Sequence, residues 1–597
     1  MNFSRSDQKN SFPVAKSRSK KSKSSVHGLS LNIVIRLFLI WLFLMAGALG
    51  LGWRLSVLQL QQGAELKGRA LQQQRFNFRP YIPRRAVVDA NNNVLATDRL
   101  IYELYVHPIM LKDREEVAQK LAEVMGDRDT TDFLKLFTTR DTGVLISKEI
   151  EENKANVIRS WKIEGIDLER SYARFYPQNN LFADILGYVD TEHTGQAGIE
   201  YSQPDLLERD VNSPGIKSLL TVNKSGDGSY LPVSLPQGIA QLDDLSVRLT
   251  VDSRLQRAVR DRLSVQMKEY KAKRGAVIVL DAQTGGILAL ACEPTYNPNE
   301  YFAYDFALFK NWTVTDSYEP GSTFKPINMA IALDEGVVKA NSIVSDPASV
   351  VIDGWPISNS SRTGLGSVSL TRALEVSSNT AMINIMRRIP RNRYYERLQE
   401  LGLNQPMGLD LPFEGVGFLK SEKVFTARDI ETAVSSFGQG LSLTPMKLVQ
   451  LVGALANGGK LITPHVVEGF INGKGELTST PELVSKQVFE PSSTEAVVKM
   501  MESVVENGTG AVAKIEGYHV AGKTGTAQKS DGKGRYSPTA RITSFVSIFP
   551  SDNPRYVILA VIDEPKGDSI YGSTVTGPVV KDVIKSLIYI KGIPPTK

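Results

Sequence analysis

The chain has 597 residues, of which 42% are hydrophobic and 22% charged, so its composition is that of an ordinary globular protein and its length predicts two or three folded domains. Its net charge of +6 comes from residues 1–30, which carry seven basic side chains and one acidic one, and this excludes a basic domain for nucleic acid. The single cysteine, Cys292, excludes an intramolecular disulfide and a cysteine-based metal site.

A basic, serine-rich tail, residues 1–36, precedes a predicted transmembrane anchor, residues 37–54. Within it, Leu37–Trp53 carry no charge and would extend for about 26 Å as a helix, and upstream apolar residues complete a full span. Positive residues before the span predict a cytoplasmic tail and an exported remainder. A cleaved signal peptide is the alternative, because Ala46-Gly47-Ala48 resembles a cleavage site. The long basic region and the apolar residues after that site favour an uncleaved anchor.

The exported part is predicted to divide into a mixed, non-catalytic pedestal domain, residues 55–240, and a catalytic domain, residues 241–597. The boundary is marked by the stretch 232–238, which is punctuated by proline and glycine. A helix is expected to continue from the anchor to about residue 75. After the boundary we expect a short strand over 245–251.

The catalytic domain carries the clearest periodic signals. Leu255, Val259, Leu263 and Met267 recur at four-residue spacing and predict a helix, and residues 276–281 and 287–291 predict a β-hairpin. Further along, residues 520–526, 543–549 and 556–562 predict three antiparallel strands, followed by a closing helix over about 580–588. These elements predict an α+β fold, in which helices cover an antiparallel sheet.

Three short motifs follow one another in this domain: S-x-x-K at Ser322–Lys325, S-x-N at Ser377–Asn379 and K-T-G at Lys523–Gly525. Alone, each is uninformative, since S-x-x-K also begins at Ser17 and at Ser530. Only one set has this order, with motif starts 55 and 146 residues apart. The combination predicts a serine acyltransferase whose general base is a lysine.

The spacing of the first motif explains its chemistry. Ser322 follows a Pro-Gly pair and begins a predicted helical run to Leu333, so Lys325, at i+3, lies on the same face. Its amine can accept the hydroxyl proton if burial and a second cation, Lys523, disfavour its charged form. A helix start also offers free N–H groups to an oxyanion. The alternative is a capping serine with a surface lysine. None of the five histidines has a triad or zinc-hydrolase setting, and His519 is interpreted as a strand residue.

At these residues, and over nearly the whole chain, the sequence resembles the class B, monofunctional penicillin-binding proteins, which are membrane-anchored D,D-transpeptidases of peptidoglycan synthesis. Arg174–Pro177, Leu186–Tyr188 and Gly195–Glu200 match signatures of that family's pedestal, and residues 84–96 resemble its R-G-x-I-x-D…L-A segment without its usual glycines. The resemblance implies a penicillin-binding transpeptidase fold with an N-terminal mixed pedestal domain and one transmembrane helix. Arg174, Gly195 and Glu200 are interpreted as docking or domain-alignment residues.

The resemblance also implies roles for the motif residues. The implied catalytic residues are Ser322, Lys325, Ser377 and Lys523, and the implied substrate-binding residues are Asn379, Thr524, Gly525 and Thr526. Ser322 would be the acylated nucleophile and Lys325 its base. Ser377 and Lys523 would pass a proton to the leaving amine, and Asn379 would hold the peptide amide. The two threonines would bind the donor's terminal carboxylate, and the N–H groups of Ser322 and Thr526 would form the oxyanion hole. No metal or cofactor is expected.

The implied reaction displaces the terminal D-Ala of a peptidoglycan stem peptide and passes the acyl group to an amine of a neighbouring stem. β-Lactams would acylate the same serine. Overall length, together with the segment Ser436–Gly440 and Leu443-Thr444-Pro445, favours the division-type subgroup, and the elongation type is the alternative. The expected partners are lipid-linked or nascent-glycan stem peptides, the membrane and a polytopic glycosyltransferase of the division machinery. The expected location is the cytoplasmic membrane at the septum, with the catalytic domain outside.

Two other functions use the same motifs. A class A β-lactamase needs an extra glutamate, and Glu400–Asn404 does spell its E-x-x-L-N string. This string lies only 21 residues past Asn379, and Gly402 ends the predicted helix Arg393–Leu401, so Glu400 is interpreted as a solvated helix-end residue. A β-lactam sensor or scaffold without turnover stays an alternative. Hydrolysis of the acyl-enzyme separates these functions, because it is fast only in a β-lactamase.

Overall fold

The structure, a computed structural model, describes residues 31–62, 75–77, 82–209, 221–223, 243–530 and 536–596. The chain forms two compact units, one of residues 1–79 with 217–240 and one of residues 80–216 with 241–597. The basic tail up to residue 30 and the predicted boundary at 232–241 lie outside the described residues.

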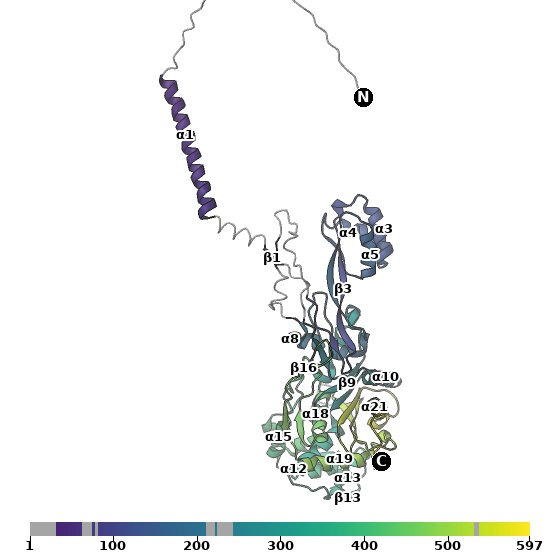
Figure 1. The fold of residues 1–597 in the computed structure, drawn as a ribbon. Helices are drawn as coiled ribbons and strands as arrows, with labels where there is room; N and C mark the ends of the chain where they lie inside the picture. Colours follow the sequence, from purple (N-terminus) through teal and green to yellow (C-terminus); the bar gives the residue numbers. More distant parts are fainter. Residues whose placement is uncertain are drawn as a thin grey trace, which may run out of the picture. The chain divides into compact units, whose positions relative to one another are not determined.

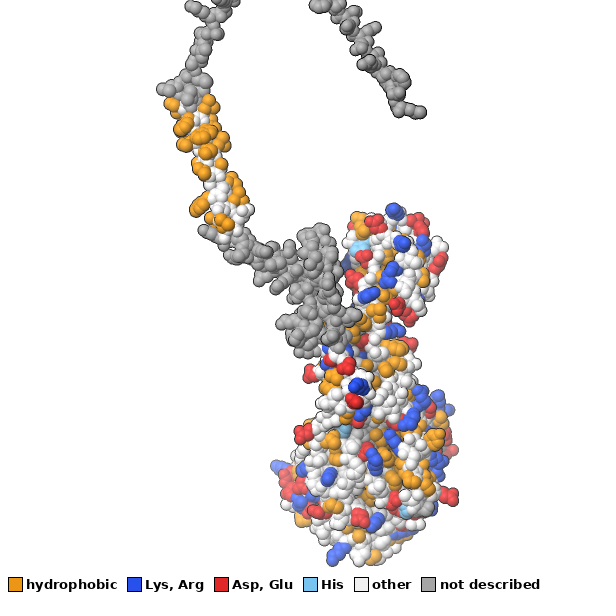
Figure 2. Space-filling view, in the orientation of Figure 1, with side chains coloured by type: hydrophobic (Ala, Val, Ile, Leu, Met, Phe, Trp, Pro, Cys, Tyr) orange, Lys and Arg blue, Asp and Glu red, His pale blue; other side chains and the backbone are white. Residues whose placement is uncertain are grey.

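The first unit contains the predicted anchor as helix α1 (Leu31–Ser56), which continues into the π-helical turn η1 (Val57–Gln61). Its 26 residues extend for about 39 Å, more than the roughly 30 Å of a bilayer's hydrocarbon core. The stretch Ile35–Leu60 is long and apolar enough to cross a membrane, and none of it is buried. Figure 2 shows hydrophobic side chains along this helix. This helix fits a single-pass membrane anchor. Among its described residues, the same unit has one antiparallel strand pair, β1 (Arg75–Asn77) with β6 (Thr221–Asn223).

The second unit is built on an antiparallel five-stranded sheet. Its strands, in spatial order, are β18 (Ala521–Ser530), β19 (Tyr536–Phe549), β20 (Tyr556–Asp563), β8 (Arg274–Asp281) and β9 (Ile287–Glu293). The predicted hairpin and the three predicted C-terminal strands are therefore confirmed. Val277 and Val279 face one core and Ile278 and Leu280 face the other, so both faces of the sheet are buried. This explains why the strands read as continuous apolar runs rather than alternating patterns.

Helices cover both faces of this sheet. The helices α10 (Ser253–Glu269) and α21 (Gly577–Lys591) pack on one face. On the other face lies α18 (Pro445–Ala456), with α12 (Lys325–Asp334) and α19 (Pro491–Asn507) around it. All twelve residues of α18 are buried, and ten of them are apolar or glycine; the other two, Lys447 and Gln450, hydrogen-bond to each other at 2.9 Å.

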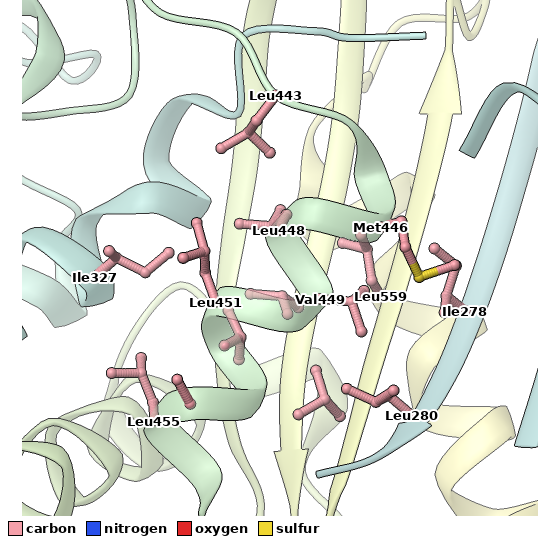
Figure 3. Close-up of a cluster of buried hydrophobic side chains, with 14 of the residues drawn as sticks. Ile278, Leu280, Ile327, Leu443, Met446, Leu448, Val449, Leu451, Leu455 and Leu559 are labelled. Atoms are coloured by element: carbon pink, nitrogen blue, oxygen red, sulfur yellow. The ribbon is translucent and has the colours of Figure 1, made fainter. Parts of the chain in front are cut away.

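Figure 3 shows the two sides of α18. Met446 and Val449 lie toward Ile278 and Leu559 of the sheet, and Leu451 lies toward Ile327 of α12. Helix α12 therefore packs into this core. The first motif spans the turn before α12 and the first residue of the helix. The fold is the predicted α+β arrangement.

A second sheet has seven strands. Its path is β16 (Leu477–Ser479), β15 (Val467–Ile471), β7 (Ser246–Leu249), β2 (Val87–Val88), β3 (Val94–Val106) and β4 (Val144–Ile150), and β5 (Ile166–Phe175) also pairs with β3. The strands β2 and β7 are parallel, with Val87 opposite Val247. Strands from both sides of the predicted domain boundary thus share one hydrogen-bonded sheet. Beyond it, α3 (Arg114–Met125), α4 (Thr130–Phe137) and α5 (Glu152–Ser160) form a separate small core with β3 and β4 (Figure 1).

The other elements of this unit are short. They are η2 (Pro108–Met110), η3 (Asn179–Phe182), α6 (Ala183–Leu186), α7 (Gly198–Ser202), α8 (Pro204–Leu207), η5 (Pro298–Ala303), η6 (Phe306–Phe309), α11 (Trp312–Thr315), η7 (Gly321–Phe324), β10 (Ile343–Asp346), β11 (Ser349–Ile352), β12 (Trp355–Ser358), β13 (Gly366–Ser369), α13 (Leu370–Glu375), α14 (Asn379–Met386), α15 (Arg391–Glu400), α16 (Glu422–Ala427), α17 (Asp429–Ser435), β14 (Lys460–Ile462), β17 (Ser485–Gln487), η8 (Ala511–Ala513) and α20 (Gly572–Val575).

The pedestal signatures form a buried ion-pair cluster. The carboxylate of Glu200 accepts hydrogen bonds from Arg174 at 2.7 Å and from Arg84 at 3.0 Å, and Arg174 also pairs with Asp98 at 2.9 Å. Glu200 is 1% exposed, so it offers no docking surface, and its ion pair with Arg174 ties β5 to α7; the alternative, a role in domain alignment, stays a prediction. A Cβ on Gly195 would lie 1.9 Å from the carbonyl oxygen of Glu200, so this glycine permits close backbone contact.

Candidate active site

The first motif occupies the turn that leads into α12. Gly321 has φ +56°, and Ser322 lies in the 3₁₀ turn η7 directly before the α-helix, rather than in the helix as predicted. Ser322 is partly exposed and Lys325 is fully buried. Ser322 lines a cavity of about 640 Å³, and so do the predicted site residues Ser377, Asn379, Thr524 and Thr526. Residues from all three motifs therefore meet at one cavity.

The amine of Lys325 lies against the second motif. Its Nζ donates to the carbonyl oxygen of Ser377 at 2.6 Å and to Oδ1 of Asn379 at 2.7 Å, and it lies 3.3 Å from the hydroxyl of Ser377. Burial and the nearby charge of Lys523 hold the pKa of Lys325 well below its usual value, and Asp346 partly opposes this shift. A neutral amine has two N–H groups and one lone pair. Three oxygen acceptors surround Nζ; a neutral amine can donate to only two of them and keeps one lone pair that can accept a proton.

The amine of Lys523 reaches the same hydroxyl from the sheet. Lys523 lies on β18 and is fully buried, and its Nζ donates to Oγ of Ser377 at 2.9 Å and to the carbonyl of Thr524 at 3.2 Å. Burial lowers the pKa of Lys523 to about 7. The hydroxyl of Ser377 thus lies between two amines whose pKa values are both lowered, mainly by burial. Such a chain of close donors and acceptors can move a proton from one lysine to the other.

Ser377 adopts an unusual backbone conformation. Its φ is +56°, the left-handed region that costs energy for a residue with a Cβ, and it lies between α13 and α14. The next residue, Ser378, caps α14 by accepting the N–H of Ala381 at 3.0 Å. The conformation directs both the carbonyl and the hydroxyl of Ser377 to Lys325, and it requires support from the residues around the loop.

That support comes from Asp346 and Asn359, which the sequence analysis did not identify. Oδ1 of Asp346 accepts hydrogen bonds from Ser378 at 2.6 Å, Thr380 at 2.7 Å and the amide of Asn359 at 2.8 Å. Oδ1 of Asn359 in turn accepts the N–H of Asn379 at 2.8 Å. Both residues follow or end short strands and belong to no motif, so only the folded chain brings them to the S-x-N loop.

Among the described strands, β18 pairs only with β19, so the third motif lies on the edge of the sheet. A Cβ on Gly525 would lie 2.5 Å from Oγ of Ser544 and 3.0 Å from a methyl group of Thr323, so a glycine here lets the strand approach the serine turn. Thr526 Oγ1 accepts the N–H of Gly572 at 3.0 Å. An open strand edge can pair with an extended peptide.

The segment around Gly438 and Glu319 fixes the serine turn. The N–H of Gly321 donates to the carbonyl of Gly438 at 2.9 Å, and the carboxylate of Glu319 accepts the N–H of Gly440 at 3.0 Å. Tyr536 also donates to this carboxylate at 3.0 Å. Glu319 therefore joins the turn to the predicted Ser436–Gly440 segment and to the β18–β19 hairpin. The sequence analysis identified the segment but not the role of Glu319.

Two secondary interpretations can be checked directly. Glu400 ends α15, Gly402 follows with φ +69°, and the carboxylate of Glu400 pairs with Arg393 at 3.0 Å and Arg397 at 2.7 Å, away from the cavity. Its interpretation as a helix-end residue is confirmed, and the E-x-x-L-N string supplies no glutamate to the site. His519 lies just before β18 and pairs with Glu502 at 2.7 Å, so its prediction as a strand residue is wrong.

Comparison with known proteins gives the same picture. Residues 275–585 match the family described as penicillin binding protein transpeptidase domain, and residues 81–210 match the penicillin-binding protein dimerisation domain. The peptidoglycan D,D-transpeptidase FtsI homolog of Mesostigma viride is 39% identical, over 96% of this chain and 98% of its own. The FtsI homolog of Chlorokybus atmophyticus is 34% identical, over 94% and 97% of the two chains.

Solved structures agree on the fold. The crystal structure of penicillin binding protein 3 from Mycobacterium tuberculosis in complex with aztreonam superimposes with a TM-score of 0.63 at 23% identity, over 87% of this chain and 98% of that one. The identities, their near-complete coverage and the two matched domains lead to one conclusion: the chain belongs to the class B penicillin-binding proteins, the family of monofunctional peptidoglycan D,D-transpeptidases.

Proposed function

We propose that this transpeptidase works through an acyl-enzyme on Ser322. The lone pair of Lys325 takes the hydroxyl proton while the oxygen attacks the carbonyl carbon of the penultimate D-Ala of a donor stem peptide. The tetrahedral oxyanion lies between the N–H groups of Ser322 and Thr526. The proton then passes through Ser377 and Lys523 to the leaving nitrogen, the peptide bond breaks and the terminal D-Ala departs. An amine of a second stem attacks the ester, and the same groups return the proton to Ser322.

One observation carries this proposal. Two fully buried lysines, 198 residues apart in the sequence, bring their amines to one serine hydroxyl at 3.3 and 2.9 Å, beside a cavity lined by the proposed nucleophile. Burying two cations so close together is unfavourable for stability, and no carboxylate forms an ion pair with either amine among the described residues. A proton-transfer role explains the arrangement. Thr524, Gly525 and Thr526 on the neighbouring strand edge would bind the donor's carboxylate, and Asn379 its amide.

We further propose that the chain acts in septal wall synthesis. The FtsI homologs that it resembles over nearly full length support a division role, and α1 supports attachment to the cytoplasmic membrane with the tail inside and the enzyme outside. A polytopic glycosyltransferase of the division machinery would supply nascent glycan. The proposed division of the chain is tail 1–36, anchor 37–54, pedestal 55–240 and transpeptidase domain 241–597. Side activity as a D,D-carboxypeptidase follows if water replaces the acceptor amine.

The test incubates the full chain with a synthetic stem pentapeptide and an amine acceptor, and measures released D-Ala and the cross-linked product. Wild type should form both and Ser322→Ala neither. Release of D-Ala without a cross-linked product would reduce the function to a carboxypeptidase. Slow acyl-enzyme hydrolysis without any peptide turnover would identify a sensor, and fast hydrolysis a β-lactamase. A tagged copy should gather at midcell, and sidewall location would favour the elongation type.

A further inference from the structure

A second cavity lies where the pedestal meets the transpeptidase domain. It has a volume of about 470 Å³, within the range of small-molecule sites, and shares no lining residue with the catalytic cavity. The pedestal contributes Gln203 and Leu206 from the segment around α8, and the rest comes from β7, β15, β16 and the loops beside them. Its apolar lining includes Leu206, Val247, Met407, Val467, Phe470 and Leu483.

One carboxylate of this lining is incompletely satisfied. Oδ2 of Asp410 accepts the N–H groups of Val466 at 2.8 Å and Val467 at 2.7 Å. Oδ1 is buried and has no hydrogen-bond partner among the described residues. Burial raises the pKa of Asp410, and the nearby His465, also in the lining, partly opposes this shift. A buried oxygen without a hydrogen-bond partner is unfavourable for stability, so a donor placed against it would be favourable.

The charged residues that line this cavity indicate which kind of hydrogen-bond donor would bind there. Among the described residues, the cavity lining contains two acidic residues, Asp410 and Glu482, and one histidine, His465, but no lysine or arginine. The site therefore disfavours anions and offers a cation both a partner and an apolar surface. We propose that this cavity binds a small molecule with an apolar body and a protonated amine, and that the amine donates to Oδ1 of Asp410.

Asp410 also joins the two parts of the unit. Its carbonyl oxygen accepts hydrogen bonds from the hydroxyl of Ser202 at 2.5 Å and from the side-chain amide of Gln203 at 2.9 Å, and both donors belong to the pedestal. Its carboxylate accepts the N–H of Val466, just before β15. A bound amine would contact both parts at once. Because it binds only the docked arrangement, it should stabilise that arrangement against unfolding.

The test uses three probes with the same phenyl ring on the detergent-solubilised full chain: 2-phenylethylamine, 2-phenylethanol and phenylacetate. Binding is measured by calorimetry. The variant Leu206→Trp, in which the larger side chain fills the cavity, is the control: any heat that it still shows comes from partition of the probe into detergent. We expect saturable binding with the amine at least tenfold tighter than the alcohol, no binding of phenylacetate, and loss of all binding in Leu206→Trp. Asp410→Asn should weaken binding of the amine at least tenfold and binding of the alcohol less than threefold.

Several results would overturn the proposal. They are titrations that are the same in wild type and Leu206→Trp, phenylacetate binding as tightly as the amine, or amine affinity unchanged in Asp410→Asn. Penicillin acylation of each variant checks that it is folded. If Asp410→Asn does not fold, the order of the three probes on wild type and their loss in Leu206→Trp decide the question.

Discussion

Replacing Lys325 by arginine tests whether Lys325 acts as a general base or only as a buried positive charge. Lys325 is fully buried and its pKa is held well below its usual value, so a neutral amine is available to take the proton of Ser322. A guanidinium stays protonated and has no lone pair for this purpose. Loss of a general base costs about 100- to 10,000-fold in rate, or about 3–5 kcal/mol in the barrier. Lys325→Arg should therefore slow acylation by penicillin about as much as Lys325→Ala.

The assay is stopped-flow acylation by a fluorescent penicillin, scaled to the folded fraction from a melting curve. Lys447 on α18 provides a matched control, because it is 6% exposed, its pKa is lowered to about 8 by burial, and its amine donates to Gln450 at 2.9 Å away from the site. Lys447→Arg carries the same cost of burying a guanidinium and should leave the acylation rate within about threefold of wild type. If Lys325→Arg acylated within about tenfold of wild type, a loss of only ~1.4 kcal/mol, Lys325 would not be the base.

Three further predictions concern protonation, loop support and the pedestal. Burial lowers the pKa of Lys523 to about 7, so unfolding takes up a proton there between about pH 7 and 10, and the free energy of unfolding should rise with pH in that window. In urea titrations, Lys523→Met should lower the slope of this free energy against pH by about 1.4 kcal/mol per pH unit, and equal slopes in the two proteins would contradict this shift. Asp346→Asn should slow penicillin acylation by about tenfold or more through loss of the S-x-N support, whereas Asp353→Asn, at the nearby β11–β12 turn, should stay within about twofold, and equal rates would exclude a positioning role. Glu200→Ala should lower the free energy of unfolding, measured in denaturant, by about 3–5 kcal/mol because it leaves two buried arginines without their shared carboxylate. Glu208→Ala, whose side chain is 56% exposed, should lower it by less than about 1 kcal/mol, and an equally small loss in Glu200→Ala would refute the structural role of Glu200.

Local sequence patterns predicted the catalytic core well. Runs such as 276–280 and 556–562 are apolar at every position because both faces of their sheet are covered, and this pattern, bounded by turn residues, is characteristic of a buried strand. The S-x-x-K spacing likewise predicts which side chains share a face, although Ser322 lies in a 3₁₀ turn. Each of these features depends on residues that are close in the sequence.

Features that depend on distant residues outside the three motifs could not be predicted. Asp346 and Asn359 support the S-x-N loop only because two short strands fold over it, and no spacing between them and Ser377 is characteristic of that contact. The parallel pairing of Val87 with Val247 joins segments 160 residues apart, across a stretch rich in turn signals. The burial of Glu200 also depends on distant residues, Arg174 of β5 and Arg84 just before β2, which pair with its carboxylate.

The central claim is that Ser322 is the residue that forms the acyl-enzyme. Peptide mapping by mass spectrometry after treatment of the full chain with penicillin tests it most directly. We expect one penicilloyl group per chain, on the peptide that contains Ser322, and no adduct in a Ser322→Ala variant that keeps the wild-type melting temperature. An adduct that persists in that variant, or that maps to Ser17 or Ser530, would contradict the assignment.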